Sequence, residues 1–447
     1  MHEYANARIV SHNLDGERVS ASAARISTTP GDAYELFDKA ADGEANRRLI
    51  GKVLSSGHSS VIEHSVFSLA VRNVSVYVEQ FFIEHRLASF TVKSRRYVDF
   101  AGQGYYIPPE LDGAEKEFYC EYMDALFAAY KRLVELDVPR EDARFILPYS
   151  LCSNFYCTVN ARELVHIIAQ MKSGRGSTVP ELRELARQLE EQLVALFPGV
   201  AGYIATAEKA CTATAGVPCA TLGELRLVPA AEAGGVELLS APVDPAALIA
   251  AASPLTGNAP GDAAGLIKAA RPRELELLNY AYSVHDLTLS GITHLARHRM
   301  QTLIVPPLDA LDPARVILPD SVSENAEARR VYLAAVERAY NTLKAHEGDA
   351  LCRDYRRYFA LSGTLADVVS SMNARELLLF FELRTCQRAQ WEIRAVATAL
   401  LRLLRGNCPE VFNAMGPSCV VKGYCPEGRL GCGRTDEIKN KFLPGNL

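Results

Sequence analysis

"TVNARELVHI", residues 158–167, and "SMNARELLLF", residues 371–380, are two versions of one short sequence, and their asparagines, Asn160 and Asn373, are 213 positions apart (373 − 160). Two further pairs recur at the same offset: His85-Arg86 with His298-Arg299, and Arg144 with Arg357. Three matches at one offset predict an internal duplication.

The duplication predicts two copies of one domain, at residues 1–225 and 235–447, joined through the Ala/Pro/Gly-containing stretch at 214–235. In each copy the Asn-Ala-Arg-Glu-Leu unit should open a helix, since Asn is a good N-cap and Glu follows three residues later. In the second copy we expect one long helix over 373–406, and a loop over 250–265. Alternating β-branched residues at 65–71 and 74–78 predict strands, so the expected fold class is α+β.

Composition indicates a globular chain that works in the cytoplasm. A formal net charge of −5 over 447 residues argues against a general nucleic-acid binder. No stretch has the length of a signal-peptide core or approaches the roughly 20 apolar residues that cross a bilayer. The eleven cysteines are scattered and odd in number, which predicts mostly reduced thiols.

Arg384 is the strongest candidate for a catalytic residue in the predicted helix. It falls in register with Leu377, Phe381 and Trp391, which places it on the apolar stripe. A guanidinium there needs a carboxylate or an anionic ligand, because burying it unpaired costs several kcal/mol. An internal salt bridge, to a glutamate such as Glu382 or Glu392, is the alternative interpretation. The equivalent position of the first copy is Met171 (384 − 213), a core residue.

Two cationic clusters are candidate anion sites. Arg297, His298 and Arg299 are adjacent, and three neighbouring cations repel one another unless a negative group lies among them. "VKSRRY" at 92–97 combines a hydroxyl with two guanidiniums, as in a phosphate site. Complementation of a helix dipole and an ordinary basic surface turn are the alternative interpretations.

Several segments resemble the flavin-dependent thymidylate synthases. They are "HSSVIEHSVF" at 58–67, "EHRLASFTVKSRRY" at 84–97, "VPREDARFILP" at 138–148, both "NAREL" units and "ELRTCQRAQWEIR" at 382–394. The resemblance covers most of the chain as two tandem copies, each with long helices packed on a small antiparallel sheet. It implies a methyltransferase that uses FAD, with NADPH and methylenetetrahydrofolate as co-substrates, to convert dUMP to dTMP. A homodimer would then reproduce the family's tetramer.

The resemblance assigns roles residue by residue. Arg384 matches the arginine that stabilises the ionised pyrimidine. The residues that match flavin contacts are Ser60, His85, Arg86, Asn160, Arg162, His166, Arg297, His298, Arg299, Asn373 and Arg375, whereas Leu379 departs from the polar residue expected there. Those that match substrate contacts are Ser94, Arg95, Arg96, Arg144, His294 and Arg357.

Departures from the family pattern divide the site between the copies. The signature glutamate is Val92 in the first copy and Val305 in the second, and the second copy has Pro307 and Asp309 at the phosphate-site Ser and Arg. The first copy has Glu84 where the second has Arg297. If a site takes residues from both copies, the pair forms one competent site and one degenerate site. A flavoenzyme acting at C5 of another uracil nucleotide, and an inactive flavin- or nucleotide-binding homologue, are the alternatives.

The C-terminal tail contains four cysteines, Cys408, Cys419, Cys425 and Cys432, among many glycines. Four thiolates can hold a structural zinc ion or an iron–sulfur cluster. Their spacings match no common Cys-x-x-Cys knuckle, so reduced cysteines or a disulfide are the alternatives.

Overall fold

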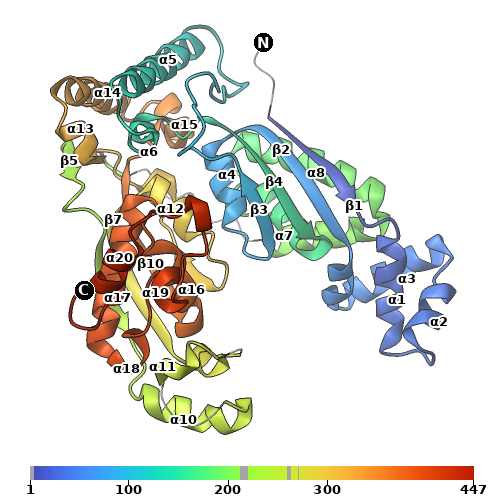
Figure 1. The fold of residues 1–447 in the computed structure, drawn as a ribbon. Helices are drawn as coiled ribbons and strands as arrows, with labels where there is room; N and C mark the ends of the chain where they lie inside the picture. Colours follow the sequence, from blue (N-terminus) through green and yellow to red (C-terminus); the bar gives the residue numbers. More distant parts are fainter. Residues whose placement is uncertain (1–4, 212–219, 259–262, 270) are drawn as a thin grey trace. The chain divides into compact units, whose positions relative to one another are not determined.

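The computed structural model describes residues 5–211, 220–258, 263–269 and 271–447 (Figure 1). These residues form two compact units: unit 1 lies within 1–132, 147–219 and 345–360, and unit 2 within 133–146, 220–344 and 361–447. Each unit therefore includes a segment from the other sequence copy. The two exchanged segments are themselves equivalent, because adding 213 to 133 and 146 gives 346 and 359.

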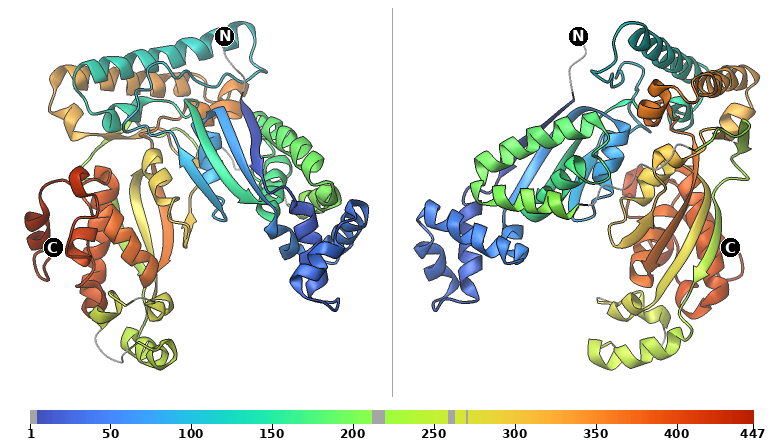
Figure 2. Two further views of the ribbon diagram at one scale, coloured as in Figure 1. Left: turned by 45° about the vertical axis from the view of Figure 1, so that its right-hand side comes forward. Right: turned by 180° about the vertical axis from the view of Figure 1, so that it is seen from behind.

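Unit 1 is built on a four-stranded antiparallel sheet. Its strand order is β1 (Asn6–His12), β2 (Val66–Ser75), β4 (Cys152–Asn160) and β3 (Ala88–Val92). The helices α7 (Ala161–Lys172) and α8 (Pro180–Leu196) lie side by side against one face of this sheet (Figure 2). Gln188 and Gln192 of α8 accept hydrogen bonds from the backbone amides of Ala7 and Ile9, at 2.9 and 2.8 Å, and so fix α8 to β1.

Unit 1 contains several further helices. They are α1 (Gly16–Ile26), α2 (Ala33–Lys39), α3 (Gly43–Ser55), η1 (Ser59–His64), α4 (Val76–Ile83), η3 (Pro198–Val200), α9 (Ala201–Ala210), α15 (Ala350–Phe359) and most of α5 (Gly113–Glu135). The segment that holds α15 comes from the second sequence copy. Its backbone is bonded within unit 1, since the Tyr149 amide donates to the Ala360 carbonyl at 2.8 Å.

Unit 2 repeats the architecture of unit 1. Its antiparallel sheet has the order β6 (Gly235–Ser240), β7 (Asn279–Thr288), β10 (Leu365–Asn373) and β8 (Gln301–Ile304), and a parallel pair is formed by β5 (Arg226–Pro229) and β9 (Arg315–Leu318). The helices are α6 (Arg140–Ala143), η2 (Arg144–Ile146), α10 (Pro245–Thr256), α11 (Ala263–Leu266), η4 (Arg273–Leu277), α12 (Leu289–Leu295), η5 (Leu308–Ala310), α13 (Asp320–Ser323), α14 (Ala326–Ala345), α16 (Ala374–Arg384), α17 (Trp391–Asn407), α18 (Pro409–Phe412), α19 (Ser418–Val421), η6 (Gly428–Leu430) and α20 (Thr435–Lys441).

The structure reproduces the sequence offset element by element. The strands β2 and β4 correspond to β7 and β10 at an offset of 213 at both ends. Even the bulged central strands match, since Asn73 and Asp286 both have a φ of 53°. Helices α8 and α17 have the same length at an offset of 211. The expected α+β fold with two tandem domains is confirmed.

Three local predictions were wrong. The helix predicted over 373–406 is divided into α16 and α17, because residues 385–390 form a turn and the Gln390 side chain caps α17 by accepting from the Ile393 amide at 3.0 Å. The strand predicted over 74–78 ends at Ser75, whose side chain caps α4. The loop predicted over 250–265 starts within helix α10, which continues to Thr256.

The structure describes only part of the linker predicted over 214–235. Its residues 214–219, like residues 259–262 of the predicted loop, lie outside the described residues. The rest of the linker contains β5 and the first residue of β6, so this stretch also contributes strands to unit 2.

Candidate functional site

Three side chains of unit 2 form a polar chain that ends at Arg384. The Arg384 Nε atom donates to His298 Nε2 at 2.9 Å, and His298 Nδ1 lies 3.3 Å from a carboxylate oxygen of Glu376. Arg384 is the last residue of α16, Glu376 lies in the first turn of the same helix, and His298 follows α12. The predicted catalytic arginine and the histidine of the Arg-His-Arg cluster are therefore in direct contact.

These contacts fix the tautomer of His298. An arginine Nε–H can only donate, so His298 Nε2 must accept and the ring proton must lie on Nδ1, from which it is donated to Glu376. Burial, opposed by Glu376 and reinforced by Arg384, lowers the pKa of His298, so the ring is neutral at pH 7. A neutral His298 orients Arg384 without adding a second positive charge beside it.

The salt-bridge alternative for Arg384 named two glutamates, and the structure gives both of them other partners. Glu382 pairs with Lys422 at 2.8 Å. Glu392 accepts from the amide and the hydroxyl of Thr288, both at 2.7 Å. Arg384 itself is half-buried rather than fully within the core. Its position therefore combines a fixed guanidinium with access from outside.

Arg144, a predicted substrate residue of the first copy, belongs to unit 2. Arg144 is buried, and its positive charge favours the ionised form of the Glu392 carboxyl. Its neighbour Asp142 accepts from Trp391 Nε1 at 2.7 Å and from the Ser321 hydroxyl at 2.6 Å, which anchors the exchanged segment. The exchange thus brings Arg144 into the unit that contains Arg384.

The remaining predicted residues of unit 2 are mostly at the surface. Arg297 and Arg299 are exposed on both sides of the buried His298, and His294 is half-buried at the end of α12. Asn373 caps α16 by accepting from the Glu376 amide at 2.9 Å, as predicted. Arg375 is exposed and pairs with Glu276.

The first copy builds the same backbone with a different set of side chains. His85 is buried and its Nδ1 donates to the Phe81 carbonyl at 2.9 Å, while burial lowers its pKa to about 3. Met171 is fully buried in the core of unit 1, as predicted. Glu84 occupies the position equivalent to Arg297, and its carboxylate is neutralised by an ion pair with Arg175.

The predicted phosphate residues of unit 1 separate into two kinds. Arg95 is buried and donates to Glu79 at 2.7 Å, and Glu79 also accepts from Ser153, so a structural ion pair accounts for Arg95. Ser94 and Arg96 are half-buried, and the Arg96 amide lies 3.3 Å from the Ser94 hydroxyl. The phosphate site predicted at these two residues stays a prediction.

Other predicted residues of unit 1 fall at helix starts or on the surface. Asn160 caps α7 through the Glu163 amide at 2.9 Å, and Arg162 pairs with Glu63 at 2.6 Å. Ser60 and Arg86 are exposed. The exposed ring of His166 has its centroid 5.7 Å from that of His85. Arg357, from the second copy, is buried in unit 1 with its guanidinium 5.6 Å from the ring centre of Tyr77.

Two buried glutamates, Glu181 and Glu392, have roles that the sequence did not predict, although Glu392 was considered as a partner of Arg384. Glu181 begins α8 and accepts from the amide and hydroxyl of Ser75, both at 2.7 Å, which repeats the contacts of Glu392 with Thr288. Burial raises the pKa of each glutamate to about 7. Their offset of 211 hid them, because the repeat was found at 213. Glu376 was visible only as a capping residue.

The four tail cysteines that were predicted as metal ligands are not together. Cys408 directly follows α17, is buried, and lies beside Tyr280 and Glu410. Among the described residues there is no group of three or more His, Cys, Asp or Glu side chains placed to hold a metal ion. The metal site predicted from the sequence therefore stays a prediction.

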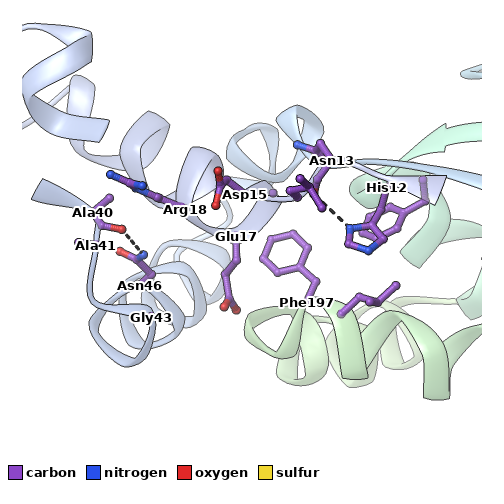
Figure 3. Close-up of a pocket in the computed structure, with 14 residues that line it drawn as sticks. His12, Asn13, Asp15, Glu17, Arg18, Ala40, Ala41, Gly43, Asn46 and Phe197 are labelled. Atoms are coloured by element: carbon purple, nitrogen blue, oxygen red, sulfur yellow. Dashed lines mark hydrogen bonds between the residues drawn. The ribbon is translucent and has the colours of Figure 1, made fainter. Parts of the chain in front are cut away.

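A pocket of ≈ 320 Å³ lies in the N-terminal part of unit 1 (Figure 3). Its lining includes His12, Asp15, Glu17, Arg18 and Phe197. Glu17 binds the Gly199 amide at 2.9 Å and Arg18 lies over the Phe37 ring at 4.0 Å, so these charges serve the packing of the unit. No predicted site residue lines this pocket, and we assign it no role in the chemistry. Within the described residues, no helix has the length and apolarity to cross a membrane.

Comparisons with known proteins decide the family. A family model described as thymidylate synthase complementing protein matches residues 8–199 and 258–410, more than half of the chain and one segment in each copy. The chain belongs to this family. The two matched segments confirm both the resemblance and the duplication, and membership implies a flavin cofactor. The prediction of an enzyme, a methyltransferase of this family, is also confirmed.

Individual relatives match less than half of this chain. The flavin-dependent thymidylate synthase of Geobacter sulfurreducens is 33% identical over 172 residues, 38% of this chain and 74% of that protein. That of Sulfurisphaera tokodaii is 28% identical over 201 residues, 44% of this chain and 77% of that protein. The solved structure of the UMP/dUMP methylase PolB from Streptomyces cacaoi, bound with 5-Br dUMP, matches with a TM-score of 0.39 and 25% identity over 47% of this chain and 97% of that chain.

Proposed function

We propose that this family member is an FAD-dependent thymidylate synthase that methylates dUMP to dTMP, with methylenetetrahydrofolate as carbon donor and NADPH as reductant. The observation that carries the proposal is the chain Glu376–His298–Arg384, which holds one guanidinium in a fixed orientation in unit 2. The equivalent position in unit 1 is the buried Met171, so the chemistry is assigned to the second copy alone.

The residues of unit 2 fit a flavin dinucleotide better than those of unit 1. Exposed Arg297 and Arg299 supply two guanidiniums suited to a diphosphate, and capping by Asn373 holds the start of α16 in place. In unit 1 the position of Arg297 is Glu84, a carboxylate that would repel a diphosphate and is neutralised by Arg175. When bound, the flavin would supply the reducing equivalents, while the protein binds and orients the reactants.

Arg384 would act on the pyrimidine ring. Methylation at C5 needs electron density at that carbon, and a guanidinium stabilises the negative charge of an ionised uracil ring because it is always charged and is already oriented. His298 holds Arg384 through Nε, and its own proton on Nδ1 is retained by Glu376. Arg144, buried near Glu392 in the same unit, would be a second substrate arginine.

Phosphate recognition is assigned to Ser94 and Arg96 of unit 1, because a hydroxyl with a guanidinium suits a nucleotide phosphate. Pro307 and Asp309 occupy the matching positions of the second copy and would reject it. We further propose that the enzyme is a homodimer, which a solution mass of twice 48.9 kDa would support.

The test is the kinetics of Arg384→Ala with dUMP, NADPH and methylenetetrahydrofolate. We expect the rate of dTMP formation to fall about 10²–10³-fold, as when one preorganised electrostatic group is removed. Arg402→Ala, on the exposed face of α17, is the control and should keep the wild-type rate. An unchanged rate in Arg384→Ala contradicts the assignment of this residue.

Wild-type outcomes separate the alternatives. A different methylated uracil nucleotide as the product would show another substrate. Bound flavin without turnover of any uracil nucleotide would show an inactive homologue.

A further inference from the structure

The last turn of α16, which ends at Arg384, is bound by a segment that follows α17. The Ser418 hydroxyl, at the start of α19, donates to the backbone carbonyl and to a carboxylate oxygen of Glu382, at 3.3 and 3.2 Å. Lys422, just after α19, pairs with the same carboxylate at 2.8 Å. The helices α16 and α19 are therefore in contact (Figure 1).

Both contacts suit the C-terminal end of a helix. The last carbonyls of a helix have no amide donor within it, and the Ser418 hydroxyl supplies a donor to the carbonyl of Glu382. A carboxylate is unfavourable at this negative end of the helix dipole, whereas the ammonium group of Lys422 is favourable there. The Glu382 side chain is only 11% exposed, so water compensates little of its charge. The compensation comes from the segment after α17.

One guanidinium binds both ends of that segment. We call residues 411–447 the C-terminal strap, and it begins just after residue 410, where the match to the family model ends. Arg405, in the last turn of α17, donates to the Phe412 carbonyl at 3.2 Å and to the Met415 carbonyl at 2.9 Å. It also donates to the Phe442 carbonyl at 2.9 Å. The strap is thus closed on α17 at its beginning and near its end.

Arg405 needs these carbonyls. It is buried, burial lowers its pKa, and within the described part of the chain it forms no ion pair with a carboxylate. Burying a guanidinium is costly unless its donors find acceptors, and here the strap backbone supplies them. Release of the strap would leave this charge without its acceptors, so the strap stays closed and keeps α19 against α16.

Unit 1 lacks both attachment residues. The position equivalent to Glu382 is Ala169 (382 − 213). The position equivalent to Arg405 is Val194, at the offset of 211 between α8 and α17 (405 − 211). The same copy has Met171 at the position of the candidate catalytic arginine. The shared fold therefore requires neither attachment, and both occur in the copy that has the arginine.

We propose that Glu382 is a positioning residue for Arg384 and that the C-terminal strap acts through it. The inference rests on the proposed function, in which Arg384 acts on the pyrimidine ring. His298 binds the Arg384 side chain at Nε, while the strap binds the backbone turn from which that side chain extends. Together the two attachments restrict the guanidinium to one orientation. Such restriction matters because a displacement of about 1 Å can cost about 10²-fold in rate.

Steady-state kinetics of the full chain test the strap. The double variant Ser418→Ala with Lys422→Met removes both contacts with Glu382. We expect its kcat for dTMP formation to fall about tenfold, less than in Arg384→Ala, since the arginine remains but is less well oriented. The KM for dUMP should change less than about twofold, because the lost interaction is with charge that develops during the reaction.

Conservative and control variants separate positioning from general folding. Lys422→Arg keeps a cation beside Glu382 and should retain the wild-type kcat. Glu382→Gln loses the ion pair but keeps hydrogen-bonding capacity, and it should show a smaller loss in the same direction if the double variant does not fold. Arg429→Met removes a positive charge at an exposed position of the strap and is the matched control, with unchanged kcat. A wild-type kcat in the double variant, or an equal loss in the control, overturns the proposal.

Hydrogen exchange of the α16 amides distinguishes failure of the strap from failure of the proposed function. In the double variant the last turn, residues 382–385, should exchange about fivefold faster, while the first turn, capped by Asn373, should be unchanged. If this difference appears but the wild type makes no dTMP, the proposed function fails and the attachment of the strap to α16 stands. If Arg384→Ala loses activity while the double variant exchanges and turns over like the wild type, the strap proposal alone is overturned.

Discussion

The two units share a scaffold and differ in where they place charge. In unit 1 a buried ion pair joins Glu79 to Arg95, with Ser153 on the same carboxylate. The equivalent positions of unit 2 are apolar and buried: Ile292, Leu308 and Ala366. The last turns of α7 and α16 show the opposite difference: unit 1 has the apolar Met171, and unit 2 has the charged Arg384. The comparison teaches that the fold requires neither charge, so each must be explained locally.

The exchanged segments add a second lesson. Residues 133–146 and 345–360 occupy equivalent positions in the two copies but belong to the unit formed by the opposite copy. Arg144 therefore lies in unit 2, near Glu392, and Arg357 in unit 1, near Tyr77. A sequence copy and a folded unit are different objects in this chain.

The largest effect should come from breaking the ion pair of unit 1. Glu79→Ala leaves the guanidinium of Arg95 buried without its carboxylate, and we expect the free energy of unfolding to fall by about 3–5 kcal/mol. Chemical denaturation of the full chain, followed by circular dichroism, measures this loss. A loss below about 1 kcal/mol, the level of an exposed pair, would show that water reaches Arg95.

The matched variant copies unit 2 into unit 1 as Glu79→Ile, Arg95→Leu and Ser153→Ala together. Replacing a buried ion pair by apolar residues is often neutral or stabilising, so the triple variant should recover most of the stability lost by Glu79→Ala. If Arg95 is structural, nucleotide binding also persists. Loss of dUMP binding in a stable triple variant would return Arg95 to the substrate site.

A smaller effect tests what the units share. Burial raises the pKa of Glu181 and of Glu392 from 4.5 to about 7, so each stays protonated in the folded chain where it ionises in the unfolded chain. The free energy of unfolding should therefore fall as pH rises from about 4.5 to about 7 and then level off with respect to these groups.

Glutamine substitution isolates this dependence. Glu181→Gln and Glu392→Gln keep the shape of the protonated acid, and each should flatten part of the decline in melting temperature between pH 5 and 7. The two variants should behave alike because Glu181 binds Ser75, the N-cap of α4, and Glu392 binds Thr288, the N-cap of α12. An unchanged pH profile in either variant would mean that its carboxyl is already ionised at pH 5.

The sequence predicted what local patterns encode. The offset of 213 gave the duplication, and Asn160 and Asn373 were recognised as caps because the cap and its partner are three residues apart. The core position predicted for Met171 is confirmed, whereas the catalytic role of Arg384, which bonds to His298, stays a prediction.

Long-range packing explains what the sequence could not show. The turn at 385–390 contains no Gly or Pro, and the helical periodicity continues through it, so only the capping contact of Gln390 marks the break. Hydrophobic periodicity does not indicate which folded unit a segment joins. That Arg144 belongs to unit 2 is therefore known from the structure alone.

The smallest effect concerns the two asparagine caps. Asn160→Ala and Asn373→Ala each remove the acceptor of one amide hydrogen bond, at equal distances of 2.9 Å, and each should cost about 1 kcal/mol of stability. Equal melting temperatures for the two variants, lowered by the same amount, are the expected result. Unequal losses would show that one helix start is held by more than its cap.

Aspartate at the same positions separates the cap from cofactor binding. Asn→Asp keeps the acceptor oxygen and suits the positive end of the helix dipole, but it replaces the amide donor by a second acceptor. Both Asp variants should therefore keep their stability. If only unit 2 binds flavin, Asn373→Asp lowers the flavin content of the purified chain and Asn160→Asp leaves it unchanged. Equal flavin loss in both variants would mean that the first copy still contributes its cap to a flavin site, and the division of labour argued from Met171 and Glu84 would then be confined to the nucleotide.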